Sequence, residues 1–263
     1  MTNPEWTGMV PVDDTALAVS DSGGAGRPVV YLNGCFASRR HWNRTIADLG
    51  DGFRHITFDE RARGSSKRSA DYSFAACLRD LEAVLQARQV RRPILVGWSY
   101  GAFIGTFWAE QNPHRVSAVV NVDGALPYGL TGEANRERIE KTFRRIRMLL
   151  PLVAPFGLAA RMSAGEHAAV NIELNELAAS CGPVLDRIGC PVRYVVGSGD
   201  SFGGSDGEHD DARAALNPHL SRNANLQVGA KVASDHGKIL RNDYRAIAQV
   251  VRDVAAADDS VTR

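Results

Sequence analysis

The sequence has 263 residues, of which 44% are hydrophobic, and this length suits one α/β domain with an insertion better than two independent domains. Thirty-one basic and 30 acidic residues leave a net charge near zero without a long basic stripe, so nucleic acid and anionic membranes are poor candidate partners. Four cysteines without C-x-x-C spacing argue against zinc and redox motifs, and the lack of a signal peptide or a membrane-spanning apolar run fits a cytoplasmic protein.

The first part of the chain predicts strands that alternate with helices. Two short strands are expected over residues 8–12 and 15–20, as an antiparallel pair at the edge of a sheet. A continuous apolar strand of the buried kind follows at residues 29–32. Further along, the pattern of apolar residues predicts helices over 39–49 and 74–87 and a strand over 54–58. This alternation implies a mostly parallel twisted sheet flanked by helices.

The clearest motif is Gly97-Trp98-Ser99-Tyr100-Gly101, which matches the pattern G-x-S-x-G. The apolar run 94–96 predicts a buried strand before it, and residues 102–110 predict a helix after it. Such a strand-turn-helix context forces the serine into a strained conformation and exposes its hydroxyl above the sheet. Ser99 is therefore the candidate nucleophile, and the amide of Tyr100 faces an oxygen that gains charge during attack.

A second turn, Asn33-Gly34-Cys35-Phe36, follows the strand at residues 29–32. The chain turns sharply at Gly34, so backbone amides of Gly34 or Cys35 are candidates to complete an oxyanion hole with Tyr100. A plain Asn-Gly turn is nearly as good an interpretation of the same spacing.

After a strand over 116–122, which ends at Asp123, the alternation stops. Residues 126–188 are helix-rich, and an insertion of this size at the C-terminal edge of the sheet predicts a helical cap over the active site. The predicted organisation is a core domain in two parts, residues 1–125 and 189–263, with the cap between them. A surface excursion without a role is the alternative interpretation of the insertion.

The core resumes with a strand over 191–196, and Asp200 lies at its exit. A Gly- and Asp-rich loop over 201–211 precedes a helix to about His219. A last strand over 226–232, the turn Asp235-His236-Gly237 and a terminal helix over 239–254 follow, and a frayed tail is expected over 255–263.

Together these features resemble the α/β-hydrolase fold superfamily, and within it the capped esterase, lactonase and carbon–carbon-hydrolase branch. The resemblance rests on the order of elements from about residue 28 to 255, on the turn at 59–66, and on Gly97-Trp98-Ser99-Tyr100-Gly101, Asp200 and Ser234-Asp235-His236. The sequence departs from the usual pattern in two places. Asn33 replaces the common histidine before the oxyanion glycine, and Ala62 replaces a glycine in the turn after the fourth strand.

The resemblance implies a Ser-His-Asp triad in which a histidine accepts the serine proton and a carboxylate stabilises the resulting imidazolium. His236 occupies the position of the general base; the other six histidines are expected at the surface or at helix ends. Two aspartates qualify as the acid. Asp123 occupies the position used in haloalkane dehalogenases, zearalenone-type lactonases and some thioesterases, and it is the favoured interpretation. Asp200, at the commoner family position, is the alternative.

The expected reaction is hydrolysis of a small, mostly apolar carboxylic ester or lactone through an acyl-enzyme, without metal or organic cofactor, by a monomer or homodimer. Residues expected to line the substrate pocket are Trp98, Phe36, His41, Tyr100, Leu150 and Leu152. The alternative functions are a thioesterase or a cofactor-free haloperoxidase. From a different class, a ligand-binding protein on a hydrolase scaffold is the remaining alternative, although such a protein has no need of the triad.

Overall fold

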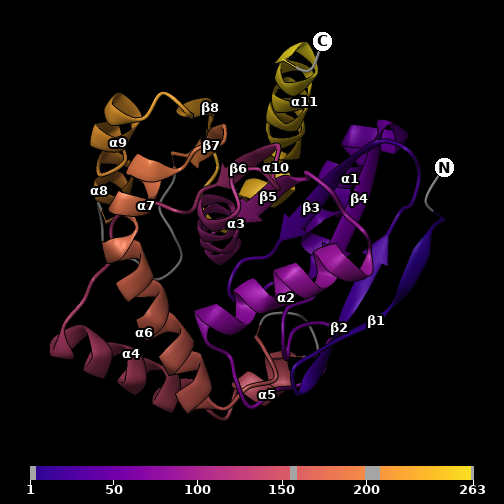
Figure 1. The fold of residues 1–263 in the computed structure, drawn as a ribbon. Coiled ribbons are helices and arrows are strands. Elements are labelled where there is room, and N and C mark those ends of the chain that lie inside the picture. Colours follow the sequence, from indigo (N-terminus) through magenta and orange to yellow (C-terminus); the bar gives the residue numbers. More distant parts are fainter. Residues whose placement is uncertain (1–3, 155–158, 199–207, 262–263) are drawn as a thin grey trace.

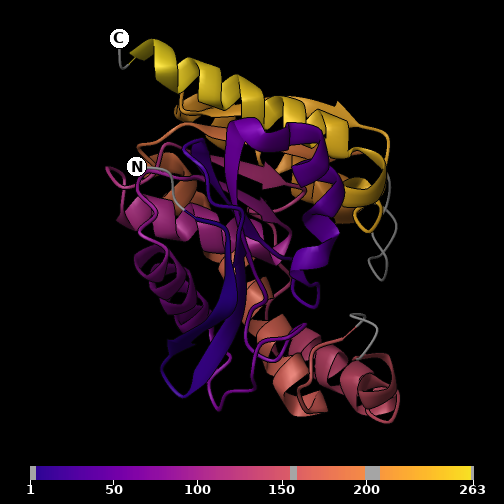
Figure 2. The same ribbon diagram turned by 90° about the vertical axis from the view of Figure 1, so that its right-hand side faces the viewer.

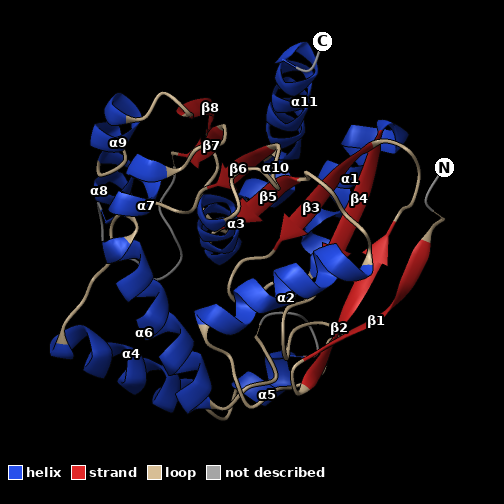
Figure 3. Cartoon of the chain, in the orientation of Figure 1, coloured by secondary structure: helices blue, strands red, loops and turns tan. Residues whose placement is uncertain are grey.

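A computed structural model of the chain describes residues 4–154, 159–198 and 208–261 (Figure 1). Within these residues, eight strands form one sheet in the order β1-β2-β4-β3-β5-β6-β7-β8. β2 pairs antiparallel with β1 and β4, and all other neighbours are parallel. The predicted α/β fold with a mostly parallel sheet flanked by helices is therefore confirmed (Figure 3). The strands are β1 Trp6–Val12, β2 Thr15–Asp21, β3 Arg27–Leu32, β4 Phe53–Phe58, β5 Ile94–Trp98, β6 Ala118–Val122, β7 Val192–Gly197 and β8 Leu226–Val232.

Helices cover both faces of the sheet because successive strand side chains point to opposite sides. In β3, Val29 and Tyr31 pack with α1 (Asn43–Leu49) and α11 (Tyr244–Val261), which lie against each other (Figure 1). Val30 and Leu32 instead join the larger core under α2 (Phe74–Ala87) and α3 (Tyr100–Gln111). The remaining helical elements are η1 Arg39–Trp42, η2 Gly50–Gly52, α4 Glu133–Ile146, α5 Leu150–Val153, α6 Ala164–Ser180, α7 Gly182–Arg187, α8 Glu208–Ala214, α9 Asn217–Arg222 and α10 Ile239–Asn242.

The helices between β6 and β7 arise from the insertion that the sequence predicts as a cap. Ser163 begins α6 with a capping box, because its side chain accepts a hydrogen bond from the Glu166 amide while the Glu166 carboxylate accepts one from the Ser163 amide. α4 packs along α6, and the pair projects from the sheet (Figure 2). The boundaries 126–188 and the function as a cap stay predictions.

Two helical segments differ in part from their predictions. The helix predicted over 39–49 is a 3-10 turn, η1, followed by α1. The tail expected to fray continues α11 to Val261, because Asp258 has partners on the core: it accepts from Ser117 Oγ at 3.1 Å and pairs with Arg27 and Arg92. Across the described ranges, no helix combines the length and apolar character needed to cross a membrane.

Candidate active site

Ser99 lies at the sharp turn between β5 and α3. Its backbone angles, φ 54° and ψ −114°, place a non-glycine residue in a strained region that the surrounding packing must maintain. A Cβ at Gly97 would collide with the Gly101 backbone, and one at Gly101 would collide with the carbonyl of Leu32. The two glycines of the motif are therefore required by the close approach of β5, α3 and β3, as the predicted nucleophile elbow demands.

Asp123 and His236 meet at the C-terminal edge of the sheet. Asp123 follows β6 and is 3% exposed, and its Oδ2 lies 2.8 Å from Nδ1 of His236. Because a carboxylate only accepts hydrogen bonds, Nδ1 is the protonated ring nitrogen, which leaves Nε2 as the basic atom. The other carboxylate oxygen accepts from the Gly197 amide at 3.2 Å.

The charge of Asp123 is supported by its surroundings. Burial raises the pKa of this carboxyl, but the hydrogen bond and charge of His236, the charge of Arg213 and the Gly197 amide outweigh it and lower the pKa overall. Arg213 of α8 brings its Nε to 3.8 Å from Asp123 Oδ1. Asp123 therefore stays ionised at neutral pH and can stabilise an imidazolium.

The alternative acid, Asp200, lies outside the described residues, so the structure gives it no position. Asp123 is the carboxylate that the structure places at His236. Its role as the acid stays a prediction.

A cavity of about 590 Å³ joins the predicted site residues. Its walls include nearly all of them: Gly34, Cys35, Phe36, His41, Trp98, Ser99, Asp123 and His236. The Trp98 ring contacts two histidine rings, with centroids 6.1 Å from His41 and 5.5 Å from His236. The turn from β3, the elbow after β5 and the loop before α10 thus form one concave site.

Three predicted pocket residues do not line this cavity. The Tyr100 side chain is 1% exposed and packs in the core, with its hydroxyl 3.6 Å from Cys77 Sγ. Leu150 is buried elsewhere and Leu152 is 66% exposed, because α5 lies near the far end of α6 (Figure 1). The insertion instead contributes α6 side chains and the segment that precedes α4, which sequence periodicity did not single out: Leu126, Tyr128, Asn171, Leu174, Asn175 and Ala178.

The two amides predicted for the oxyanion hole are those of Cys35, on the cavity wall, and of Tyr100, next to Ser99. Among the described residues, the N–H groups of Cys35 and Tyr100 have no hydrogen-bond acceptor. The carbonyl of Gly34 accepts from the Ala37 amide at 3.0 Å, which fixes the peptide plane that carries the Cys35 N–H. A Cβ at Gly34 would lie 2.8 Å from the Trp98 ring, so this position also requires glycine.

The turn after β4 carries charged residues that the fold buries. Its charged residues are almost fully buried: Asp59, Glu60, Arg61 and Arg63 are each 3% exposed or less. Asp59 accepts hydrogen bonds from the amides of Arg39 and Ser65, and Arg61 pairs with Asp80 of α2. The sequence carried one signal, four charges within the five residues 59–63, but their partners come from distant segments. Ala62, at the position where the resembling family has glycine, adopts φ 61°.

Two of the six histidines expected at the surface or at helix ends are buried. His55 is 7% exposed with its Nδ1 2.8 Å from the Tyr31 hydroxyl, and His167 is fully buried against Phe36 and Phe143. Neither lines the cavity. In the described part of the chain, no group of three His, Cys, Asp or Glu side chains is arranged to hold a metal ion.

Comparisons with known proteins agree with this fold. Residues 27–157 match the family described as alpha/beta hydrolase fold. The chain is 33% identical over 133 residues to the uncharacterized protein YqjL of Bacillus subtilis, covering 48% of this chain and 51% of that protein. It is 36% identical over 104 residues to the putative carbamate hydrolase RutD of Klebsiella pneumoniae, covering 38% of this chain and 39% of that protein. The matches thus span about half or less of these relatives.

Among solved structures, an esterase from Exiguobacterium antarcticum superposes with a TM-score of 0.74 at 19% identity, covering 94% of this chain and 98% of that one. At this identity the likeness shows a shared fold.

Proposed function

From the premise that the chain belongs to the α/β-hydrolase fold family, we propose that it is a serine hydrolase that cleaves a carboxylic ester or lactone of a small, mostly apolar substrate. The observation that carries the proposal is the 2.8 Å contact between His236 Nδ1 and Asp123 Oδ2, with Ser99 on the wall of the same cavity. A binding protein on this scaffold has no use for such a carboxylate–imidazole pair in the same cavity as a strained serine.

The proposed mechanism assigns one task to each group. His236 Nε2 takes the proton of Ser99 as the serine oxygen attacks the carbonyl carbon, and Asp123 stabilises the imidazolium that forms. The oxyanion accepts hydrogen bonds from the amides of Cys35 and Tyr100. The tetrahedral intermediate collapses as His236 protonates the leaving alcohol, and water then repeats the sequence on the acyl-enzyme to release an acid.

The cavity wall favours an uncharged substrate. The described residues that line it include no Lys, Arg or Glu, and Asp123 is already engaged by His236. Phe36, Trp98, Phe103, Leu126 and Leu174 supply apolar surface. Asn171 and Tyr128 add polar groups that can orient an ester or lactone oxygen.

Hydrolysis rates on a panel of p-nitrophenyl esters, aryl esters and macrocyclic lactones test this proposal. We expect wild-type turnover of at least one class and none with Ser99→Ala, which should fold normally because the change removes one oxygen atom. Thermal unfolding of both proteins is the control for folding. Undiminished turnover by folded Ser99→Ala, or no wild-type turnover of any class, would overturn the proposal.

A further inference from the structure

Two buried charges beside the site have no task in the proposed mechanism. Glu60 and Arg63 lie in the turn after β4 and are 2% and 3% exposed. Burying a carboxylate and a guanidinium is costly unless their hydrogen-bonding groups are satisfied. The partners that satisfy these two side chains lie mainly in the segment 33–35, which carries the Cys35 amide.

Glu60 binds Asn33, the first residue of that segment. Its Oε1 accepts from the Asn33 backbone amide at 3.0 Å, and its Oε2 accepts from Asn33 Nδ2 at 2.8 Å. Asn33 also donates to the Phe58 carbonyl at 2.7 Å and accepts from Trp42 Nε1 at 3.0 Å. These hydrogen bonds fix the position of the Asn33 side chain, which is 1% exposed.

Arg63 binds Cys35, the last residue of that segment. Its Nε and Nη2 both donate to the carbonyl of Cys35, at 2.9 and 2.7 Å, and its Nη1 donates to the carbonyl of Arg61 at 2.8 Å. Within the described residues, no carboxylate forms an ion pair with Arg63. Its hydrogen bonds to two carbonyls fix the direction of the Cys35 peptide.

The three constraints leave the Cys35 N–H with one orientation. Asn33 is fixed before Gly34, the Gly34 carbonyl is fixed by Ala37, and the Cys35 carbonyl is fixed by Arg63. Because a trans peptide directs its N–H away from its C=O, the Cys35 N–H points opposite to the Gly34 carbonyl. Preorganised donors of this kind do not have to reorganise during reaction, which is how an oxyanion hole lowers a barrier.

We propose that Glu60 and Arg63 are positioning residues that hold the Cys35 amide in the oxyanion hole, an inference that rests on the proposed function. Neither side chain lines the cavity, so both act through segment 33–35. A merely structural pair would stabilise the turn without affecting transition-state binding. The two possibilities differ in kinetics, because a displaced oxyanion donor lowers kcat and leaves substrate affinity largely unchanged.

Glu60→Gln and Arg63→Lys are the informative variants, with p-nitrophenyl butyrate as substrate and an alkyl trifluoromethyl ketone as inhibitor. The serine adds to the carbonyl carbon of the ketone, and the carbonyl oxygen becomes an oxyanion. The affinity for the ketone therefore measures how well the oxyanion hole binds that oxygen. The glutamine side chain would present an amide N–H to an Asn33 donor, and the lysine side chain would replace two hydrogen bonds to Cys35 by one. We expect kcat to fall about tenfold to 100-fold, less than loss of a whole donor, with the ketone Ki raised by a similar factor and KM within about twofold.

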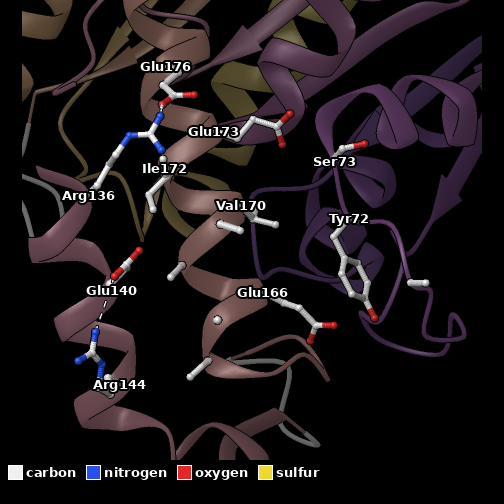
Figure 4. Close-up of a pocket in the computed structure, with 15 residues that line it drawn as sticks. Tyr72, Ser73, Arg136, Glu140, Arg144, Glu166, Val170, Ile172, Glu173 and Glu176 are labelled. Carbon is white, nitrogen blue, oxygen red and sulfur yellow. Dashed lines mark hydrogen bonds and ion pairs between the residues drawn. The ribbon is translucent and has the colours of Figure 1, made fainter. Parts of the chain in front are cut away.

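Two matched variants control for the chemistry of the substitutions. Glu173→Gln changes a glutamate of α6 that accepts from the Phe74 amide at 2.9 Å and lies in a separate groove (Figure 4). Arg54→Lys changes a buried arginine that pairs with Asp21 at 2.6 Å. Both are expected to keep wild-type kcat and ketone Ki.

The outcomes separate the two proposals. Wild-type kcat and Ki in folded Glu60→Gln and Arg63→Lys would overturn the positioning role while Ser99-dependent turnover upholds the hydrolase. A fall in kcat with unchanged Ki would also overturn it. If Glu60→Gln does not fold, Arg63→Lys decides the matter alone. Wild-type protein that turns over no ester or lactone of the panel and does not bind the ketone would refute the proposed function itself.

Discussion

Acidic and basic side chains gather in two regions of this molecule. The side chains of one region are exposed and those of the other are buried, and this difference decides their roles. The groove between α4 and α6 has a volume of about 760 Å³ and carries the pairs Arg136–Glu176 and Arg144–Glu140 (Figure 4). These side chains are 43–69% exposed. The edge of the sheet instead holds Asp123, Glu60 and Arg63, each 3% exposed or less.

The difference shows why charge alone does not mark a site. Water screens the groove pairs and competes for their hydrogen bonds, so their side chains can rotate without loss. The charges at the sheet edge are fixed by specific donors and acceptors, which gives the backbone beside them one conformation. The groove is also larger than the cavity that holds Ser99, yet the strained residue and the carboxylate-imidazole contact belong to the smaller one.

The largest effect in this comparison is expected from Asp123→Asn. The change removes the charge that stabilises the imidazolium and favours the wrong tautomer of His236, so kcat should fall about 10³- to 10⁴-fold. Steady-state hydrolysis of the best ester, with Asp200→Asn in parallel, measures it. Near-wild-type rates for Asp123→Asn together with loss in Asp200→Asn would transfer the role of the acid to Asp200.

Arg61→Met tests the buried side of the comparison for stability. Arg61 is fully buried and donates to Asp80 Oδ1 at 2.8 Å, and Asp80 is fully buried as well. Removing the guanidinium leaves an uncompensated carboxylate, so the free energy of unfolding should fall by about 3–5 kcal/mol. Urea denaturation measures the change. A fall under about 1 kcal/mol would mean that this buried pair contributes no more to the free energy of unfolding than the exposed pairs of the groove do.

Glu60→Gln tests how burial affects the pH dependence of stability. Burial raises the pKa of Glu60 to about 7, and the opposing effects of the Arg63 charge and the Asn33 hydrogen bonds do not cancel it. An unfolded glutamate titrates near 4.5, so between these values the folded state binds the proton more tightly and loses stability as pH rises. The glutamine variant lacks this penalty, so its stability relative to wild type should rise between pH 4.5 and 7, by at most about 3 kcal/mol.

Denaturation midpoints of both proteins across this pH range provide the measurement. Parallel stability profiles would contradict the raised pKa, and a relative fall with rising pH would contradict its sign.

The smallest effect is expected in the groove. Glu176→Gln breaks the exposed pair with Arg136 and should change the free energy of unfolding by less than about 1 kcal/mol and leave kcat unchanged. The same urea denaturation series measures it. A loss comparable to that of Arg61→Met would erase the distinction between the two regions.

Sequence reasoning predicted the parts of the site that depend on local pattern. Ser99 could be identified from the sequence because a buried strand, a turn with two glycines and a helix follow one another there, and this order determines a nucleophile elbow. His236 and Asp123 could be identified because both follow strands that end at one edge of a parallel sheet.

What escaped prediction depends on contacts between distant segments. In the sequence, Glu60 and Arg63 look like surface charges. Their partners lie 27 and 28 residues away: Asn33 donates to Glu60, and the Cys35 carbonyl accepts from Arg63. The α6 wall of the cavity escaped for a similar reason. Its Asn171 and Asn175 carry no apolar signal, whereas Leu150 and Leu152 do, and only the packing of α6 decides which of them face the site.

The proposed hydrolase requires Ser99 to be an activated nucleophile. Mass spectrometry after treatment with a fluorophosphonate tests it most directly, because the reagent phosphonylates a serine that a neighbouring histidine deprotonates. We expect one adduct on the peptide that contains Ser99 in the folded wild type, and no adduct after unfolding or in Ser99→Ala. A folded wild-type protein that remains unmodified, or that is modified at another residue while Ser99 stays free, would contradict it.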